Sequence, residues 1–454
     1  MDRNKIKERL ELALRHAEPP TIEEVLEQVS RHGVLRGAVD WVFPAWMLYV
    51  EYAAEKIAET FPLSEEERRQ LSDFRDTLKR LLLEAWTQTK EKLTTLYKAV
   101  AEGTYRVEGN RLYAPDGTWL NARENFAPRI TIRGVSAKTY FPDLLKLPRE
   151  RLELLQLGWR SSDEGEMMKR PYMGTTQPWQ VFAWIATRYG ELRVSIASVI
   201  LTREGISISV QFRANSWRQR WSKTEAVDLV ASHLKRGEWA PLLTAWLGDG
   251  NVKWREYRLT ISTKEPWRLG IRDSAYRALV AKGKEAFAKL REAAGVYGEL
   301  LDVSRSYKWI YIKLTTDDAF RAAYKLNKKG VITVAGVVMY LHLASGGGGS
   351  LYANYYTRDL EKARTVAKRL KEAGLRPNMM RIGPTYAVYV PITNVVKLAK
   401  RDKAIRKAVA LYLADKAKNG TPRQKEIAKT ILKRYPLFSY PSTPLKPASL
   451  AQSA

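Results

Sequence analysis

A divergent internal repeat in the second half of the chain constrains its fold more than any other feature. Residues 224–330 and 331–402 share one predicted order of elements: an apolar helix, a strand ending in Thr and a basic residue, a helix closing in Ala-Gly, two strands and a short helix. The elements predicted for the first copy are helix Glu225–Gly248, strand Tyr257–Thr263, a helix to Ala294, and strands Val296–Val303 and Lys308–Leu314. Those predicted for the second copy are helix Val334–Ala344, strand Leu351–Thr357, a helix to Ala373, and strands Arg376–Ile382 and Tyr386–Val390. A repeated supersecondary unit determines the architecture of the part of the chain that contains it.

The rest of the chain divides by composition and periodicity. Residues 1–101 are predicted to be helical, with capping boxes at Thr21–Glu24 and Ser64–Glu67. Residues 102–223 alternate apolar and polar positions and contain hairpins, which predicts an α+β region. Residues 331–434 hold the second copy and C-terminal helices, and 435–454 form a tail rich in Pro, Ser and Ala. The predicted fold class is α+β: a helical N-terminal region, a β-rich middle region and a duplicated αββαββα-like C-terminal part.

The charge balance indicates a polyanionic partner. The 454 residues include 77 Lys and Arg against 49 Asp and Glu, a net charge of +28. The basic residues are spread along the whole chain, which favours extended positive surfaces over a basic arm. Nucleic acid is the first candidate partner, and an anionic membrane surface is the second.

Composition also excludes several classes of site. The chain has no cysteine, which excludes disulfides, zinc fingers, iron–sulfur clusters and thiol nucleophiles. Its four histidines form no metal-ligand spacing. The longest apolar runs are shorter than the ~20 residues that a membrane span needs, so we expect a cytoplasmic protein. Abundant Glu, Lys and Arg without cysteine suit a heat-adapted protein.

One short motif carries the strongest chemical signal. Residues 242–250 read LLTAWLGDG, an apolar helix pattern that ends in Asp249-Gly250 before a basic, aromatic strand. A carboxylate at the end of a buried helix beside such a strand can hold a divalent metal over a phosphate backbone. The alternative is that Asp249-Gly250 only ends the helix in a turn.

This motif and the repeat resemble the LAGLIDADG homing endonucleases. The resemblance implies two signature helices packed at a pseudo-twofold axis, each delivering one carboxylate, with sheets that form a saddle over the DNA major groove. It implies that Asp249 is catalytic and holds Mg²⁺. It also implies a double-stranded DNA partner, and a single-chain duplicate needs no dimer, so we expect a monomer. The whole chain also resembles a paralogous family of hyperthermophilic archaea, which implies no activity.

The second copy departs from this pattern. Its matching segment, Met339–Gly347, reads MYLHLASGG and continues into further glycines, so the expected second acid is missing. Loss of half the metal ligands predicts either a nicking endonuclease or a catalytically silent DNA binder. The alternative function is a non-catalytic DNA- or RNA-binding protein, either a regulator or maturase-like.

The predicted strands supply a candidate reading surface. Basic, amide and aromatic side chains on alternating strand positions suit base edges and phosphates. The candidate DNA-binding residues are Lys253, Trp254, Arg255, Arg258, Lys264, Lys308, Lys313, Tyr352, Asn354, Tyr356, Arg358 and Arg381. The alternative is a solvated sheet face on a basic protein, and aromatic residues among basic ones equally suit single strands and RNA.

Overall fold

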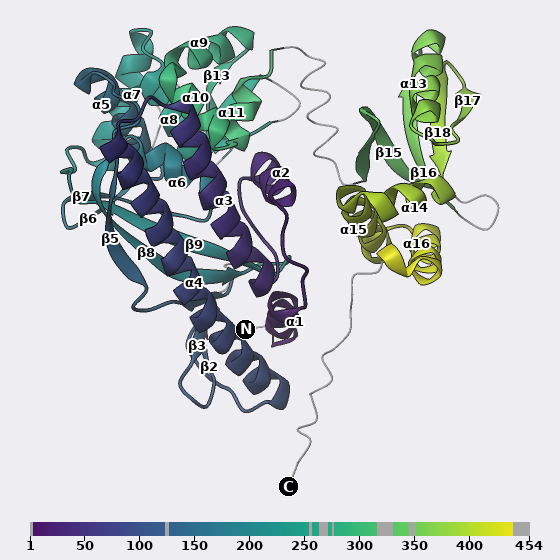
Figure 1. Cartoon of the computed structure of the whole chain (residues 1–454), viewed down its shortest axis with the longest axis horizontal. Coiled ribbons are helices and arrows are strands. Elements are labelled where there is room, and N and C mark those ends of the chain that lie inside the picture. The colour runs from purple at the N-terminus through teal and green to yellow at the C-terminus, as the bar shows by residue number, and fades with distance from the viewer. Residues whose placement is uncertain are drawn as a thin grey trace. The chain divides into compact units, whose positions relative to one another are not determined.

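The chain forms two compact α+β units, residues 1–315 and 316–454 (Figure 1). The computed structural model describes residues 3–122, 127–253, 257–262, 271–274, 277–315, 330–344 and 350–438. The predicted boundaries after residues 101 and 223 both fall inside the first unit.

The first unit begins with the predicted helices. They are α1 (Arg3–Leu14), α2 (Ile22–His32), α3 (Val39–Thr60) and α4 (Glu65–Glu102). Both predicted capping boxes are present, because Thr21 and Ser64 accept the N3 amides and Glu24 and Glu67 reach back to the cap amides. Among the described residues, no helix is long and apolar enough to span a membrane.

A nine-stranded antiparallel sheet packs one face against these helices (Figure 1). Its strands are β1 (Arg106–Glu108), β2 (Arg111–Tyr113), β3 (Trp119–Asn121), β4 (Arg129–Thr131), β5 (Ser136–Phe141), β6 (Gly165–Met167), β7 (Arg170–Thr175), β8 (Gly190–Leu201) and β9 (Ile206–Ala214). Their order is β1-β2-β3-β4-β8-β9-β7-β6, and β5 also pairs with β8. The predicted hairpin over residues 192–212 is confirmed as β8 and β9. Its alternation places Leu192, Val194 and Ile196 in the core and the residues between them on the opposite face.

Two segments of the first unit share a strand order, but they are not the two predicted copies. Residues 149–235 have the element order αββαββα, and the described residues of 240–294 have the order αββββα. The helices of these segments are α5 (Arg149–Ser161), α6 (Pro178–Ile185), α7 (Lys223–Lys235), α8 (Ala240–Asp249) and α9 (Lys284–Ala294). The second segment contains β10 (Gly250–Asn251), β11 (Arg258–Ser262), β12 (Ile271–Ser274) and β13 (Arg277–Lys282). In β6-β7-β9-β8 and in β10-β11-β13-β12, the strands follow the same order: first, second, fourth, third.

Several elements predicted for the first copy are wrong. The single helix Glu225–Gly248 is two helices, because Gly237 has φ +84° and Pro241 starts a new helix. The predicted strands Val296–Val303 and Lys308–Leu314 are helices α10 (Val296–Val303) and α11 (Tyr307–Ile312). In α10 the buried residues Tyr297, Leu300 and Leu301 follow helical spacing. The segment is short and apolar, and such a segment can be mistaken for a strand.

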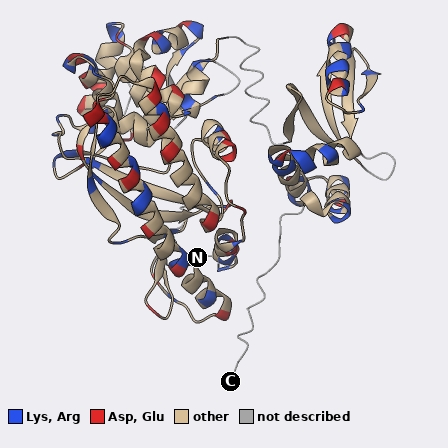
Figure 2. Ribbon diagram, viewed as in Figure 1, with Lys and Arg blue, Asp and Glu red and all other residues tan. Residues whose placement is uncertain are grey.

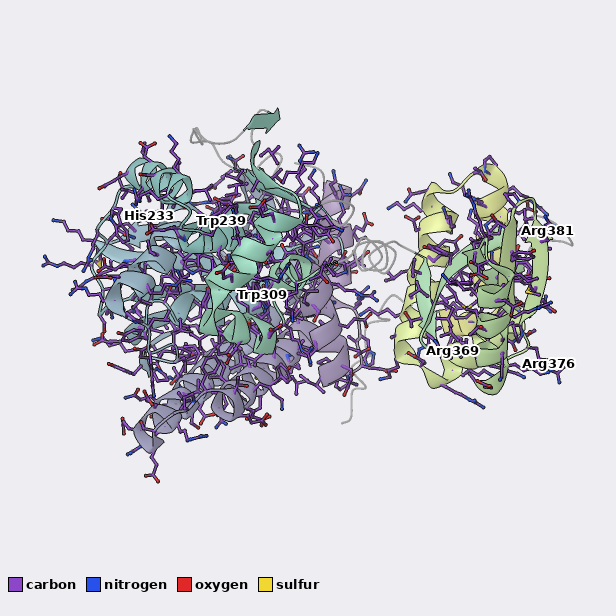
Figure 3. All side chains as sticks on the ribbon, turned by 90° about the horizontal axis from the view of Figure 1, so that it is seen from above. His233, Trp239, Trp309, Arg369, Arg376 and Arg381 are labelled. Atoms are coloured by element: carbon purple, nitrogen blue, oxygen red, sulfur yellow. The ribbon has the colours of Figure 1, made fainter. Side chains whose placement is uncertain are left out.

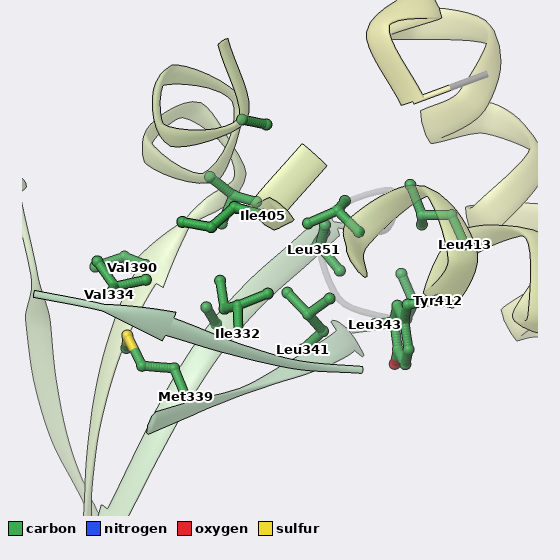
Figure 4. Packing of buried hydrophobic residues seen from close by; sticks show 14 of the residues in the cluster. Ile332, Val334, Met339, Leu341, Leu343, Leu351, Val390, Ile405, Tyr412 and Leu413 are labelled. Carbon is green, nitrogen blue, oxygen red and sulfur yellow. The ribbon is translucent and has the colours of Figure 1, made fainter. Parts of the chain in front are cut away.

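The second unit is a five-stranded antiparallel sheet with helices packed on one face. Its elements are β14 (Val331–Val334), β15 (Val337–Ala344), β16 (Ser350–Thr357), α13 (Leu360–Glu372), β17 (Asn378–Ile382), β18 (Thr385–Pro391), α14 (Ile392–Arg401), α15 (Lys403–Asn419), α16 (Pro422–Arg434) and a 3-10 turn at Pro436–Phe438. The strand order is β14-β15-β16-β18-β17. Inward side chains such as Met339, Leu351 and Val390 meet Ile405 and Leu413 of α15 in one core (Figure 4).

The predicted signature helix Val334–Ala344 is wrong. This segment ends β14, turns at Ala335 and Gly336 and continues as β15. Both turn residues have positive φ, +47° and +72°, which is the geometry of a two-residue hairpin turn. Val337, Met339, Leu341 and Leu343 are buried, so the period is two rather than 3.6. The strand, helix, two strands and helix predicted after it are confirmed as β16 to α14.

Candidate functional site

Helices α5 and α8 of the first unit pack directly against each other through glycines. A Cβ on Gly158 would lie 2.0 Å from the Pro241 carbonyl oxygen and 2.1 Å from Thr244 Oγ1. A Cβ on Gly248 would lie 2.2 Å from Ser162 Oγ. Thr244 Oγ1 also donates 2.7 Å to the Leu155 carbonyl, which ties α8 to α5. Only residues without side chains permit this approach.

Two carboxylates meet where these helices end. Asp163 follows α5 and precedes β6, while Asp249 ends α8 and precedes β10. Their carboxyl groups lie within hydrogen-bonding reach of each other. Asp163 is exposed and Asp249 is half-buried, so the pair opens to solvent. The second acid, which is missing from Met339–Gly347, therefore has a counterpart in Asp163. The sequence analysis did not predict this residue. An available signal was the apolar helix Leu152–Trp159 followed by Asp163-Glu-Gly165.

The environment of the pair favours a proton or a cation between the two acids. Burial, and then the charge of Asp163, raise the pKa of Asp249 to about 7, although Lys223 and Lys308 act in the opposite direction. Two adjacent carboxylates cannot both ionise without a compensating charge. Below about pH 7 Asp249 therefore holds a proton unless a cation replaces it.

Each acid-bearing helix end also carries one lysine. Lys223 Nζ donates to the Ser162 carbonyl beyond α5. Lys308 Nζ donates to three carbonyls at the end of α8: Trp246 at 3.4 Å, Leu247 at 2.7 Å and Gly248. Ammonium groups here compensate the negative ends of the two helix dipoles. Burial lowers the pKa of Lys308 to about 8, although both acids oppose this.

A short hydrogen-bond chain orients Asp163. Gln180 Nε2 donates to Asp163 Oδ2 at 2.5 Å. The same amide's Oε1 accepts from Thr175 Oγ1 at 2.5 Å, which fixes which end of the amide faces the acid. Tyr307 lies near enough for the charge of Asp163, after burial, to raise its pKa to about 12. Asp163 is therefore positioned although it is exposed.

A buried ion pair fixes the backbone just after Asp163. Glu164 and Arg188 have side-chain exposures of 0% and 2%. Glu164 Oε1 accepts from Arg188 Nη2 at 2.8 Å and Gln219 Nε2 at 2.7 Å. Glu164 Oε2 accepts from Arg188 Nε at 2.9 Å and Trp184 Nε1 at 2.8 Å. Such a pair is tolerated in the interior because its carboxylate is fully hydrogen-bonded.

The helix-free face of the nine-stranded sheet, which we call the outer face, is basic and aromatic. Strand register assigns residues to this face, because directly paired residues point to the same side. Its basic residues are Arg106, Arg111, Arg129, Lys138, Arg170, Arg193 and Arg213. Its aromatic residues are Tyr113, Trp119, Tyr140 and Tyr172, and its acidic residues are Glu108 and Glu191. None of these basic residues was among the predicted contacts.

Stacked side chains stiffen one end of the outer face. The Arg111 guanidinium lies 4.5 Å from the Trp119 ring centre, and that of Arg106 lies 5.0 Å from the Tyr113 ring centre. A hollow of about 320 Å³ beside them is lined by Glu108, Asn110, Arg111, Tyr113 and Asn121. Stacked guanidinium groups keep donors for phosphate while they lose side-chain freedom.

The predicted nucleic-acid contacts do not gather on one surface. Trp254, Arg255 and Lys264 lie outside the described residues. Lys253 is half-buried. Exposed Lys313 pairs with Asp302. The main chain of Arg258 bonds to the Tyr311 hydroxyl.

One of these contacts is wrong. Lys308 was predicted to bind nucleic acid, but it is 2% exposed and lies behind the acids. A helix, rather than a strand, carries it into the core.

The predicted contacts in the second unit divide between two faces. Tyr352, Asn354 and Tyr356 alternate along β16 and share one face. Arg381 pairs with Tyr386, whose ring packs toward the core, so Arg381 faces the other side. Arg358 is exposed just beyond β16.

The close helix contact gives a prediction for stability. We expect Gly158→Ala to lower the free energy of unfolding of the first unit by about 1–3 kcal/mol, because a methyl group would push α5 and α8 apart. Urea denaturation would measure the change. Gly174→Ala is the matched control, since a Cβ there meets nothing closer than 3.5 Å. Equal effects of the two substitutions would contradict the packing account.

The raised pKa of Asp249 gives a pH-dependent prediction. The folded protein holds this proton up to about pH 7, whereas the unfolded chain releases it near pH 4. The folded state thus binds more protons between these values, and stability from this group falls as pH rises from about 4 to 7. In denaturant titrations between pH 4.5 and 8, we expect the free energy of unfolding of the Asp249→Asn variant to exceed that of wild type by on the order of 1–3 kcal/mol. Asp73→Asn, on the exposed face of α4, should show no such gain.

In comparisons with protein families, curated proteins and solved structures, nothing matches the chain. Function is therefore inferred from the geometry of the two acids and of the outer face.

Proposed function

We propose that the chain is a divalent-metal-dependent endonuclease that binds double-stranded DNA on the outer face and hydrolyses a phosphodiester bond at Asp163 and Asp249. One observation carries the proposal: the ends of two helices, packed through Gly158 and Gly248, hold two carboxylates side by side. This arrangement is similar to the signature helices of LAGLIDADG endonucleases. The αββαββα order of residues 149–235 supports the same likeness.

The residues present fit Mg²⁺. Carboxylate oxygens are its preferred protein ligands, and it commonly uses one or two of them together with substrate phosphates and water. Asp163 and Asp249 would be the two carboxylate ligands, and among the described residues no group of three or more His, Asp or Glu could hold a metal ion. A bound Mg²⁺ would activate water and stabilise the leaving oxygen.

The chain's own side chains prepare this site. Asp163 and Asp249 supply the ligands, and Gln180 holds the Asp163 carboxylate in place. Lys308 is buried and compensates the end of α8. Lys223 is exposed and can also meet a phosphate oxygen. With two acids present, cleavage of both strands becomes as well supported as nicking.

A second candidate function is DNA binding without cleavage. The observation that favours it is the pair of ammonium groups, on Lys223 and Lys308, that act electrostatically on Asp249 without any metal. In that case the acids and lysines form a structural cluster between two helices.

A supercoiled plasmid assay separates the two candidates. We expect nicked or linear product with Mg²⁺ and none with EDTA, together with a rise in melting temperature when Mg²⁺ is added. Salt-sensitive binding with neither cleavage nor a Mg²⁺-dependent melting shift would support the non-catalytic candidate instead.

The outer face gives a prediction for binding. Replacing Arg129 and Arg193 together by Gln should lower the salt dependence of duplex binding by about two units of slope, since each phosphate contact contributes about 0.9. Fluorescence anisotropy with a labelled duplex between 50 and 200 mM salt would measure it. Arg69→Gln, on α4, is the matched control because its side chain is 69% exposed and lies away from the sheet. An unchanged slope in the double variant would remove the outer face as the binding surface.

A further inference from the structure

The second unit carries an aromatic surface that the proposed nuclease site does not use. The inward residues of its sheet form the core with α13 to α16. On the opposite face, four tyrosines surround Asn354. Tyr352 and Tyr356 lie two positions away along β16, and Tyr340 and Tyr389 pair with Asn354 from β15 and β18. We call these five residues the tyrosine face.

The tyrosine face is exposed at Tyr356, half-buried at its other three tyrosines, and held by contacts among its own side chains. None of its five residues belongs to the core with the helices. Tyr356 is 45% exposed, and neighbouring Met380 and Ile382 are 47% and 52% exposed. The Tyr352 and Tyr389 rings meet edge to face at 5.3 Å, and Asn354 Nδ2 donates 3.0 Å to the Tyr356 hydroxyl. These contacts hold the rings in place, so a ligand would not have to order them.

The charge of the unit indicates what kind of ligand the tyrosine face takes. Residues 330–438 contain 21 Lys and Arg against 6 Asp and Glu, a difference of +15 that exceeds half of the whole chain's +28. Strands β14 to β18 contain no Asp or Glu. Figure 2 shows the basic residues concentrated on α13 and α15, and Figure 3 places Arg376 and Arg381 at the margin of the unit. Like charge disfavours pairing with a second copy, whereas a polyanion is attracted.

Exposed aromatic rings on a strongly basic unit suit unpaired bases. Every base has a flat face that stacks on tyrosine, but in a duplex these faces are covered by neighbouring base pairs. An exposed ring platform therefore selects for a single strand, and the net positive charge of the unit attracts the phosphates of that strand. The central residue Asn354 is buried at 7% exposure, and its amide holds the Tyr356 ring in place.

We propose that the tyrosine face binds an unpaired DNA strand by stacking its bases on Tyr356 and the neighbouring rings. The preference for DNA over RNA rests on the proposed function of the first unit. The stacking surface itself does not depend on that function, because it lies in a separate unit and needs neither Asp163 nor Asp249.

The test measures binding of full-length protein, in EDTA, to a labelled oligothymidylate of about 12 nucleotides. We expect Tyr356→Ala to weaken this binding about 5- to 100-fold, since one stacked base contributes ~1–3 kcal/mol. Tyr356→Phe keeps the ring and should bind within about twofold of wild type.

A matched substitution in the first unit makes the test specific. Leu83 on α4 is 54% exposed, close to the 45% of Tyr356. Leu83→Ala should leave oligothymidylate binding unchanged, and Tyr356→Ala should leave duplex binding unchanged. Equal binding by Tyr356→Ala and wild type would overturn the proposal, as would an oligouridylate that binds well where oligothymidylate does not. Because no cleavage is measured, loss of the proposed nuclease activity would not affect this outcome.

Discussion

Replacing either Asp163 or Asp249 by asparagine is expected to reduce Mg²⁺-dependent DNA cleavage by more than about 100-fold while duplex affinity stays within a few-fold. Asparagine preserves the size of the side chain but removes the charge that holds a divalent cation. The two carboxylates share one site, so each single variant should lose nearly as much activity as the double variant.

Plasmid cleavage time courses would measure this loss. Asp73→Asn, an exposed acid on α4, is the control and should cleave like wild type. If Asp163→Asn kept full activity while Asp249→Asn lost it, Asp249 would be the one acid that catalysis needs, as the sequence alone predicts. If both variants cleaved normally, the chemistry would lie elsewhere in the chain.

The largest expected loss of stability follows Arg188→Met. This change leaves the Glu164 carboxylate buried without its main partner, so we expect the free energy of unfolding to fall by about 3–5 kcal/mol. Arg188 makes two of the four hydrogen bonds that the Glu164 carboxylate accepts. Urea denaturation, followed by tryptophan fluorescence, would measure the change.

Two comparisons make this result specific to the ion pair. Arg193→Met, on the exposed outer face, should change stability by no more than about 0.5 kcal/mol. Removing both partners in Arg188→Met with Glu164→Leu should recover part of the loss, because no buried charge then remains unpaired. A double variant less stable than Arg188→Met alone would contradict this account.

The sequence predicted correctly those helices and strands whose local pattern fits only one kind of element. Capping boxes set the starts of α2 and α4, and period-two alternation gave β8 and β9. The failures were short apolar segments. Val331–Ala344 and Val296–Val303 are rich in residues that suit either element, and only the turn at Ala335-Gly336 or the burial pattern distinguishes them.

The candidate site was predictable to the extent that it is local. Asp249 ends an apolar helix before a glycine, and that pattern is visible in the chain. Asp163 lies beside Asp249 only because α5 packs on α8, where Gly158 lies against Pro241 and Thr244 and Gly248 lies against Ser162. The burial of Lys308 could not be predicted from the sequence. It depends on Tyr307–Ile312 forming helix α11 where the sequence predicts a strand. The outer face was missed because its seven basic residues come from seven separate strands.

Manganese binding tests the paired-carboxylate site most directly, since Mn²⁺ takes the place of Mg²⁺ at oxygen ligands and is visible by electron paramagnetic resonance. At pH 8, with duplex DNA present, wild-type protein should bind Mn²⁺, and Asp163→Asn and Asp249→Asn should each lose that binding. Binding that persists in both variants, or that is absent from wild type, would contradict a metal held between Asp163 and Asp249.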